Sequence, residues 1–150
     1  MIALALQGGC SLLPVARLPF YSGPLRPLEQ TARLLNPGGV LSIDGKSVAA
    51  AIEKAKAGSS RNPTMVADVI PGRHRVVVEL PMAANVPDKA PVRWNQPFTL
   101  EWVSKADKDY FLIIEHLNDK QATIKINESD GRGFREAIRR YEEQEQKARQ

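Results

Sequence analysis

Cysteine, histidine and aromatic residues are scarce in this 150-residue chain, and long apolar runs are missing. The sequence holds one cysteine and two histidines, and aromatic residues make up 6% of it. A single cysteine excludes an internal disulfide, so packing alone must hold the core together. No segment approaches the ~20 apolar residues that a membrane-spanning helix requires. With 43% hydrophobic and 25% charged residues, the sequence predicts one domain of ordinary globular composition.

Sequence patterns that mark catalytic or nucleic-acid-binding sites are also lacking. No serine lies in a Gly-x-Ser-x-Gly turn, and Gly38-Gly39 is too short a glycine string to cradle a phosphate. No Asp or Glu is predicted to face inward from a strand. The basic residues behind the net charge of +4 are interleaved with acids, and no stacked aromatics lie among them. We therefore expect no catalytic residues, no cofactor and no nucleic-acid partner.

The two histidines offer one weak metal hypothesis. His74 and His116 can meet only if their strands are neighbours, with Glu115 or Asp68 as a further ligand. A half-buried, hydrogen-bonded ring at the rim of a sheet is the more common role for such residues. We therefore expect no metal.

Cys10 follows the apolar run Ile2–Leu6 and the small residues Gly8-Gly9. A lone thiol in this position is typical of the cleavage and acylation site of a bacterial lipoprotein. The match is partial, because no Lys or Arg precedes the run and the run is shorter than a normal signal-peptide core. The alternative is an intracellular protein in which residues 1–13 are a frayed or buried start and Cys10 is an ordinary small hydrophobe. We favour lipid attachment at Cys10, which anchors without spanning the membrane.

Composition and periodicity divide the chain into four segments. Residues 1–9 form a truncated signal-peptide-like segment, and residues 10–39 form a proline-rich tether and lead-in. Within the lead-in, Leu28–Leu35 allows two helical turns. Residues 40–130 form the β domain, and residues 131–150 form a C-terminal helix with a polar tail.

The middle of the chain alternates between apolar and polar residues with a period of two. Strands are predicted, with a short helix at 48–57, over residues 40–44, 65–70, 73–80, 98–102, 110–117 and 122–126. Asp44-Gly45 and Pro71-Gly72 suit tight turns. The sequence thus predicts a mainly β fold, an antiparallel β-sandwich or partly open barrel of about six to seven strands with a C-terminal α-helix.

The C-terminal helix has one narrow apolar stripe. Phe134, Ile138 and Tyr141 recur at the helical period. Beyond Tyr141 no large apolar residue follows, so we expect the helix to fray over residues 142–150.

Two groups of motifs resemble those of a known class of proteins. One is the Tyr-x-Gly-Pro-x-Arg-Pro string at Tyr21–Pro27, and the other pairs Asp44-Gly45 with the Pro-Gly-x-His-x-Val-x-Val string at Pro71–Val78. This layout resembles small proteobacterial envelope lipoproteins of unknown function, and its second part resembles PEGA-type β-sandwich modules. The resemblance covers roughly Cys10–Ile126 and implies a periplasm-facing domain anchored in the outer membrane. Ser11, directly after the cysteine, is similar to the outer-membrane sorting type.

A few residues are candidates for binding. Arg26 lies between two prolines, where a rigid lead can lay its guanidinium against the domain, and Tyr21 begins the same string. Trp94 lies in a proline-rich loop and is the better candidate for an exposed stacking platform. Trp102 and Tyr110 are in strand phase and are expected in the core.

The sequence-based hypothesis is a non-enzymatic, lipid-anchored envelope protein that acts as a binding or structural module. Its expected partners are the membrane, through the lipid, and another envelope protein or peptidoglycan or polysaccharide. The first alternative is an accessory or assembly subunit of a secretion or pilus-like machine that uses a sheet edge. The second is a small envelope hydrolase.

Overall fold

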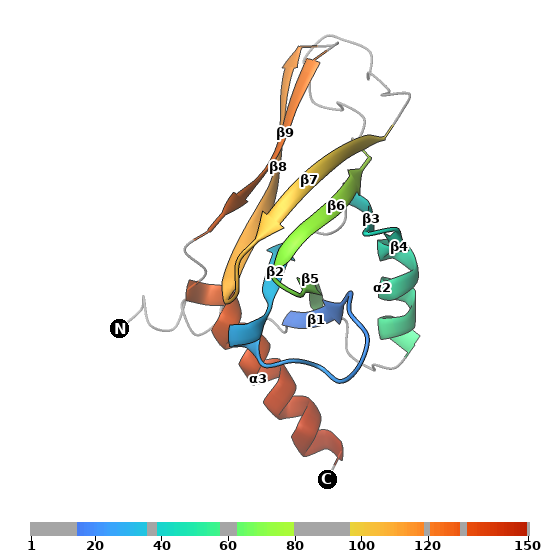
Figure 1. Ribbon diagram of the computed structural model, residues 1–150. Coiled ribbons are helices and arrows are strands. Elements are labelled where there is room, and N and C mark those ends of the chain that lie inside the picture. The colour runs from blue at the N-terminus through green and yellow to red at the C-terminus, as the bar shows by residue number, and fades with distance from the viewer. Residues whose placement is uncertain are drawn as a thin grey trace, which may run out of the picture.

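The computed structural model describes residues 15–35, 39–57, 63–79, 97–118, 121–129 and 132–149. Within this part, nine strands form two sheets that do not close on themselves, and two α-helices flank them (Figure 1). The mainly β class and the C-terminal helix are therefore confirmed. The strand count exceeds the six predicted ranges by three, because two strands come from the lead-in and the two residues Lys46–Ser47 form a short strand of their own.

The larger sheet has five strands in the order β1-β5-β2-β8-β9, and the smaller has four in the order β4-β3-β6-β7. The strands of the larger sheet are β1 (Val15–Pro19), β2 (Ala32–Leu35), β5 (Thr64–Val69), β8 (Lys108–Asn118) and β9 (Gln121–Glu128). Those of the smaller sheet are β3 (Val40–Ile43), β4 (Lys46–Ser47), β6 (Gly72–Val78) and β7 (Phe98–Ser104). The helices are α2 (Val48–Ala57) and α3 (Arg132–Arg149), and a 3-10 turn, η1, covers Leu28–Gln30.

The two sheets differ in strand direction. The smaller sheet is antiparallel throughout. The larger sheet is mixed, because β1 runs parallel to β5 and β2 runs parallel to β8, while β2–β5 and β8–β9 are antiparallel. Parallel neighbours need crossover connections, and the chain supplies them through the smaller sheet and α2.

The larger sheet is covered on both faces. Its Leu18, Leu34 and Ala67 belong to a core shared with Val76 of β6 and with Trp102 of β7. On the opposite face a second core joins the larger sheet to α3, and its members are Val15, Leu28, Leu35, Val66, Ala137 and Ile138. The layers are therefore the smaller sheet with α2, then the larger sheet, then α3.

The lead-in expected at residues 10–39 is wrong for its described part. β1 and β2 are strands of the larger sheet, and every residue of β2 is buried. The helical turns expected over Leu28–Leu35 are reduced to η1, after which the chain enters β2. The consecutive residues Leu34 and Leu35 face opposite cores, which suits a strand covered on both sides.

Most elements of the predicted β domain are confirmed. β3, α2, β5 and β6 lie where the periodicity places them, and Gly45 turns the chain after β3 with φ of 82°. The alternation in β6 holds, with Val76 and Val78 buried and Arg73 exposed. Trp102 and Tyr110 are buried, as expected, with their rings edge to face at 5.2 Å.

The β8–β9 hairpin departs from the expected mid-sheet position. Only Lys108–Phe111 of β8 pairs with β2, and the rest of its described ladder is with β9 alone. The two strands extend past the ends of β6 and β7 in Figure 1.

The C-terminal helix is longer than the apolar stripe predicts. α3 continues to Arg149 instead of fraying after Tyr141. Its first half packs on the larger sheet through Ile138 and through Phe134, whose ring meets that of Phe111 edge to face. Residues with good helix propensity, such as Glu, Gln, Lys and Arg, carry the second half.

Candidate functional site

A groove runs along the outer strand of the larger sheet. It has a volume of about 600 Å³, and Ala16–Pro19 of β1 form its floor. Ala51, Lys54 and Ala55 of α2 line one wall. Tyr141, Glu142, Glu145, Gln146 and Arg149 of α3 line the other, and Leu25 of the β1–β2 loop adds an apolar side chain. Figure 1 shows β1 between the two helices.

The main-chain groups of β1 alternate between the sheet and the groove. The N–H of Phe20, just after β1, donates to the carbonyl of Asp68 at 2.9 Å. By alternation, Ala16 and Leu18 also direct their main-chain groups toward β5, whereas Arg17 directs its own away. No other strand in the described part of the chain pairs with that side of β1. Pro19 lies at an outward position, where its missing N–H costs the sheet nothing.

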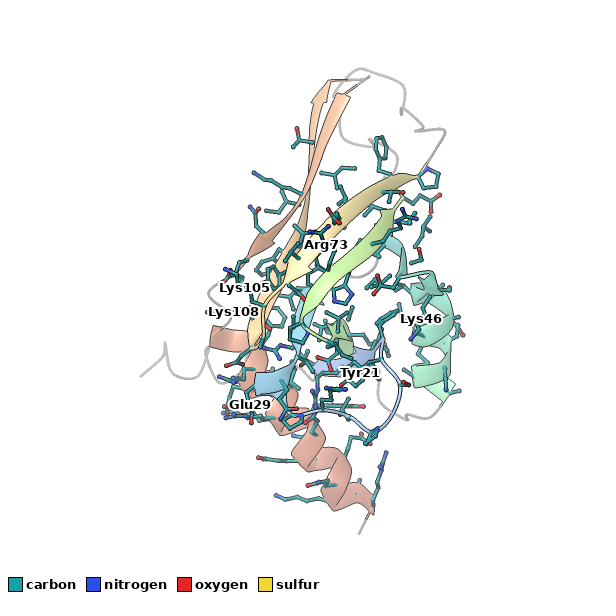
Figure 2. The ribbon with its side chains drawn as sticks, viewed as in Figure 1. Tyr21, Glu29, Lys46, Arg73, Lys105 and Lys108 are labelled. Atoms are coloured by element: carbon teal, nitrogen blue, oxygen red, sulfur yellow. The ribbon has the colours of Figure 1, made fainter. Side chains whose placement is uncertain are left out.

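The string Tyr21–Pro27 forms the loop beside this edge. The Tyr21 hydroxyl donates to Asp68 Oδ2 at 2.7 Å and accepts from the Arg26 N–H at 3.1 Å. Burial, followed by the bond donated to Asp68, raises the pKa of Tyr21 to about 12. The guanidinium of Arg26 lies 5.6 Å from the centre of the Tyr21 ring. The Lys46 ammonium donates to the Phe20 carbonyl at 3.1 Å, at the start of the loop (Figure 2).

The string is docked on the domain, as predicted, but through Tyr21 and the Arg26 main chain, not through the Arg26 guanidinium. The Arg26 side chain is exposed and stacks on Tyr21. Its carbonyl accepts from Arg17 Nη1 at 2.7 Å. The two candidate residues thus position the loop that carries Leu25 into the groove.

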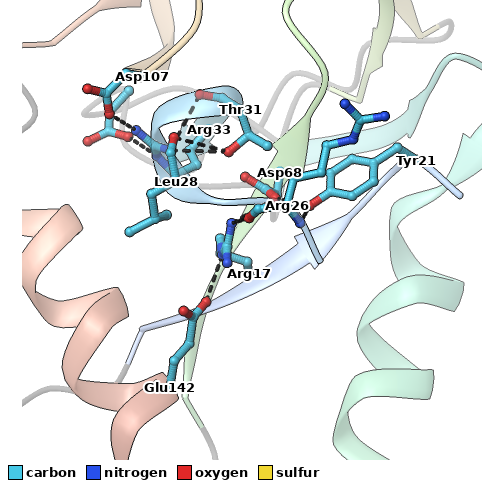
Figure 3. Close-up of polar contacts among 10 residues, drawn as sticks. Arg17, Tyr21, Arg26, Leu28, Thr31, Arg33, Asp68, Asp107 and Glu142 are labelled. Carbon is cyan, nitrogen blue, oxygen red and sulfur yellow. Dashed lines mark hydrogen bonds and ion pairs between the residues drawn. The ribbon is translucent and has the colours of Figure 1, made fainter. Parts of the chain in front are cut away.

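Arg17 joins the sheet, the loop and α3 at the side of the groove (Figure 3). Its Nε donates to Glu142 Oε1 at 2.8 Å, and its Nη1 lies 3.4 Å from Asp68 Oδ2. The Arg17 side chain is 4% exposed and that of Asp68 is fully buried. The guanidinium is therefore desolvated and neutralised, which fixes β1 against α3.

Asp68 is a buried carboxylate with an incomplete set of partners. Burial raises its pKa, and this outweighs the lowering effects of the Tyr21 and Thr31 hydroxyls and of the Arg17 and Arg33 charges. Its Oδ1 has no hydrogen-bond partner among the described residues. Such a group favours its neutral form more than an exposed aspartate does.

A second buried ion pair lies farther along the same face of the sheet. The Arg33 Nε donates to Asp109 Oδ1, with the side chains 1% and 2% exposed. Arg33 Nη1 donates to the Leu28 carbonyl at 2.7 Å, and Nη2 lies 3.5 Å from Asp107. The expectation that no acid faces inward from a strand is therefore wrong, because Asp68 and Asp109 both do.

Sequence analysis missed Arg17, Arg33 and Asp68 as members of these networks. The signal was present at two of the three positions. Arg33 interrupts the apolar run Ala32–Leu35, and Asp68 interrupts Met65–Ile70. A charge inside an apolar strand implies a buried partner, because an unpaired buried charge is too costly.

His74 belongs to a different contact, between the two halves of the second motif group. Its Nδ1 lies 2.6 Å from Asp44 Oδ2 and its Nε2 lies 2.6 Å from the Ile70 carbonyl. Both partners accept hydrogen bonds, so the ring of His74 bridges the Asp44 carboxylate and the main chain just before β6. Partial burial raises the pKa of Asp44, but hydrogen bonds from His74 and from the Arg75 N–H outweigh it, and the net shift is downward. The Asp-Gly turn and the Pro-Gly-x-His strand are thus held together by their own polar residues.

The remaining candidates give no further site. Cys10 and Trp94, and the side chains of Glu115 and His116, lie outside the described residues. Among the residues that the structure describes, no cluster of three His, Cys, Asp or Glu side chains is arranged to hold a metal. None of the helices in the described ranges is long and apolar enough to cross a membrane. Comparisons of the chain with protein-family models, curated proteins and solved structures give no match.

Proposed function

We propose that this protein is a non-enzymatic, lipid-anchored binding module of the bacterial envelope, held in the outer membrane by Cys10 and facing the periplasm. The supporting observation is that Val15, the first residue of β1, lies only five positions after Cys10 in the sequence. Five residues reach at most about 18 Å. A lipid on Cys10 therefore keeps β1 and its groove close to the membrane surface, without a long tether.

The groove supports binding over catalysis. Its floor and the α2 wall are largely apolar, through residues such as Leu18, Ala51 and Ala55. Asp68 and Asp109 are buried and lie against arginines instead of lining the groove. The α3 wall of the groove does hold two carboxylates, but Glu142 is paired with Arg17 and only Glu145 is left without an ion pair among the described residues. The hydrolase alternative, which needs two carboxylates available to the substrate, is therefore less well supported.

An accessory or assembly subunit of an envelope machine is the second candidate. It is favoured by the outer strand β1, which presents main-chain groups to the groove. An edge of this kind can accept a strand from another subunit. Both candidate functions include the lipid anchor. They differ in the partner, because an assembly subunit is expected to bind the same machine component each time.

The Cys10→Ser variant tests the anchor. We expect it to fold like the wild type and to move from the membrane to the soluble fraction of cells. Ser11→Ala is the matched control, because it changes the neighbouring residue and leaves the thiol in place. Membrane association that is equal in Cys10→Ser and the wild type would falsify the anchor.

A further inference from the structure

The groove beside β1 combines an outward-facing strand edge with two helical walls. By the alternation of β1, the main-chain N–H and carbonyl of Arg17 are directed away from β5, and Arg17 lines the groove. An unpaired strand edge is complementary to the main chain of another extended segment and to little else. The edge thus identifies the chemical class of the occupant.

We propose that this groove binds a short, extended, acidic peptide segment of an envelope partner, which adds to β1 as a sixth strand of the larger sheet. The inference rests on the proposed role as a binding module and names its partner class. It does not depend on the lipid at Cys10.

Pro19 limits the length of the added strand. Proline offers no N–H, so the donors of this edge end at Arg17, although the Pro19 carbonyl can still accept. An occupant therefore makes only a few main-chain bonds, centred on Arg17. The same proline protects the edge from indiscriminate pairing, which leaves specificity to the side chains.

The walls leave room for the side chains of the occupant. Ala51 and Ala55 are one helical turn apart on α2, and they place only methyl groups beside the strand edge. Leu18 and Leu25 add larger apolar surfaces. Alternate apolar side chains of an added strand would pack here, because successive side chains point to opposite faces.

The charges on the walls favour carboxylates on the occupant. Glu142 is engaged by Arg17. Lys54 and Arg149 both line the groove, and neither has a carboxylate within ion-pair distance in the described ranges of the chain. Glu145 is the one acid of the lining that likewise lacks an ion-pair partner among those residues. The groove therefore offers two uncompensated cations against one acid.

Selection from a displayed library of random peptides tests the proposal. Peptides of roughly eight residues, the length of an ordinary strand with its flanks, are selected on the full chain. The Ala55→Trp variant fills the groove, and Ala50→Trp places the same side chain on an exposed position of α2. We expect enriched peptides that alternate apolar residues with Asp or Glu. A synthetic copy should bind about tenfold more weakly to Ala55→Trp and unchanged to Ala50→Trp.

Two further measurements separate the strand mode from other modes. Methylating alternate peptide nitrogens of the synthetic copy should abolish binding if its main chain pairs with β1. Lys54→Glu, on the groove wall, should weaken the acidic peptide, whereas Lys56→Glu, exposed on the same helix and outside the groove, should not. Lys54→Glu keeps the test valid if Ala55→Trp fails to fold.

Three results would overturn the inference. The first is that no peptide is enriched on the wild type relative to Ala55→Trp. The second is that the methylated peptide binds as tightly as the unmethylated one. The third is that Ala55→Trp and Lys54→Glu weaken binding no more than their controls do. None of these bears on membrane fractionation. A failed anchor and a failed peptide site are therefore distinguishable.

Discussion

Arg17, Arg33, Asp68 and Asp109 place four charges on the face of the larger sheet that α3 covers. Each is nearly or fully buried, and each lies against an opposite charge. Such pairs add little net stability relative to apolar residues, but removing one partner leaves the other charge buried without compensation. These ion pairs therefore fix the positions of the β1–β2 loop and of α3 on the larger sheet.

Tyr21→Phe tests the loop network. The substitution leaves Asp68 without its 2.7 Å donor and the Arg26 N–H without its acceptor. We expect the free energy of unfolding to fall by about 1–3 kcal/mol, the cost of leaving the buried Asp68 carboxyl without this donor. Urea denaturation measures it. Ser22→Ala, an exposed change in the same loop, is the control. A loss for Tyr21→Phe no larger than the control's would contradict the network.

Asp44 and Asp68 predict opposite dependences of stability on pH. The folded pKa of Asp44 lies below its ordinary value of 3.8, so its contribution is present above that pH and is lost as the pH falls through the folded pKa. The folded pKa of Asp68 lies above 3.8, so its contribution is present below that pH and is lost as the pH rises through the folded pKa.

Urea denaturation of Asp44→Asn and Asp68→Asn between pH 3 and pH 7 checks both signs. Relative to the wild type, Asp44→Asn should become more destabilised as the pH rises. Asp68→Asn should become less destabilised, or more stable, over the same range. Parallel slopes in the two variants would show that one of the directions is wrong.

Strands that are buried on one face could be predicted from the sequence, whereas β2, a short strand that is buried on both faces, could not. β6 and β7 alternate because one face of each strand is buried and the other is not, and the sequence shows that alternation. β1 and β2 carry no such signal. β2 is buried on both faces and has only four residues, one of them Arg33. Its neighbours in the fold, β5 and β8, come from distant parts of the chain and cannot be read locally.

The same limit applies to the candidate site. Tyr21 and Arg26 are predictable from the sequence because they belong to the motif at Tyr21–Pro27, and both lie in the loop beside the groove. The groove itself was not predicted, because its walls are helices some ninety residues apart in sequence that meet only across β1. Glu142 could not be predicted as a site residue, because only the structure shows its contact with Arg17.

Ile138→Ala tests the contact between α3 and the larger sheet. Ile138 is fully buried against Val15, Leu35 and Val66. Truncating it should lower the free energy of unfolding by about 2–5 kcal/mol, the usual cost of a core cavity. Arg139→Ala, exposed on the next position, should change it by less than about 0.5 kcal/mol. A small effect in Ile138→Ala, measured by thermal or urea unfolding, would mean that the helix is not docked as described.

For the whole molecule, the layers assign a role to each side. The smaller sheet and α2 close one face of the larger sheet, and α3 closes the other. β1 lies between the helices as the outer strand and is the described element nearest in sequence to Cys10. If Cys10 carries the proposed lipid, the groove beside β1 stays close to the membrane surface.

The most direct test of the account is the mass of the N-terminal peptide of the protein purified from its native membrane. We expect a mature chain that begins at Cys10 and carries diacylglyceryl and acyl groups on that residue. An unmodified Cys10 thiol within a peptide that still contains the residues before it would contradict it.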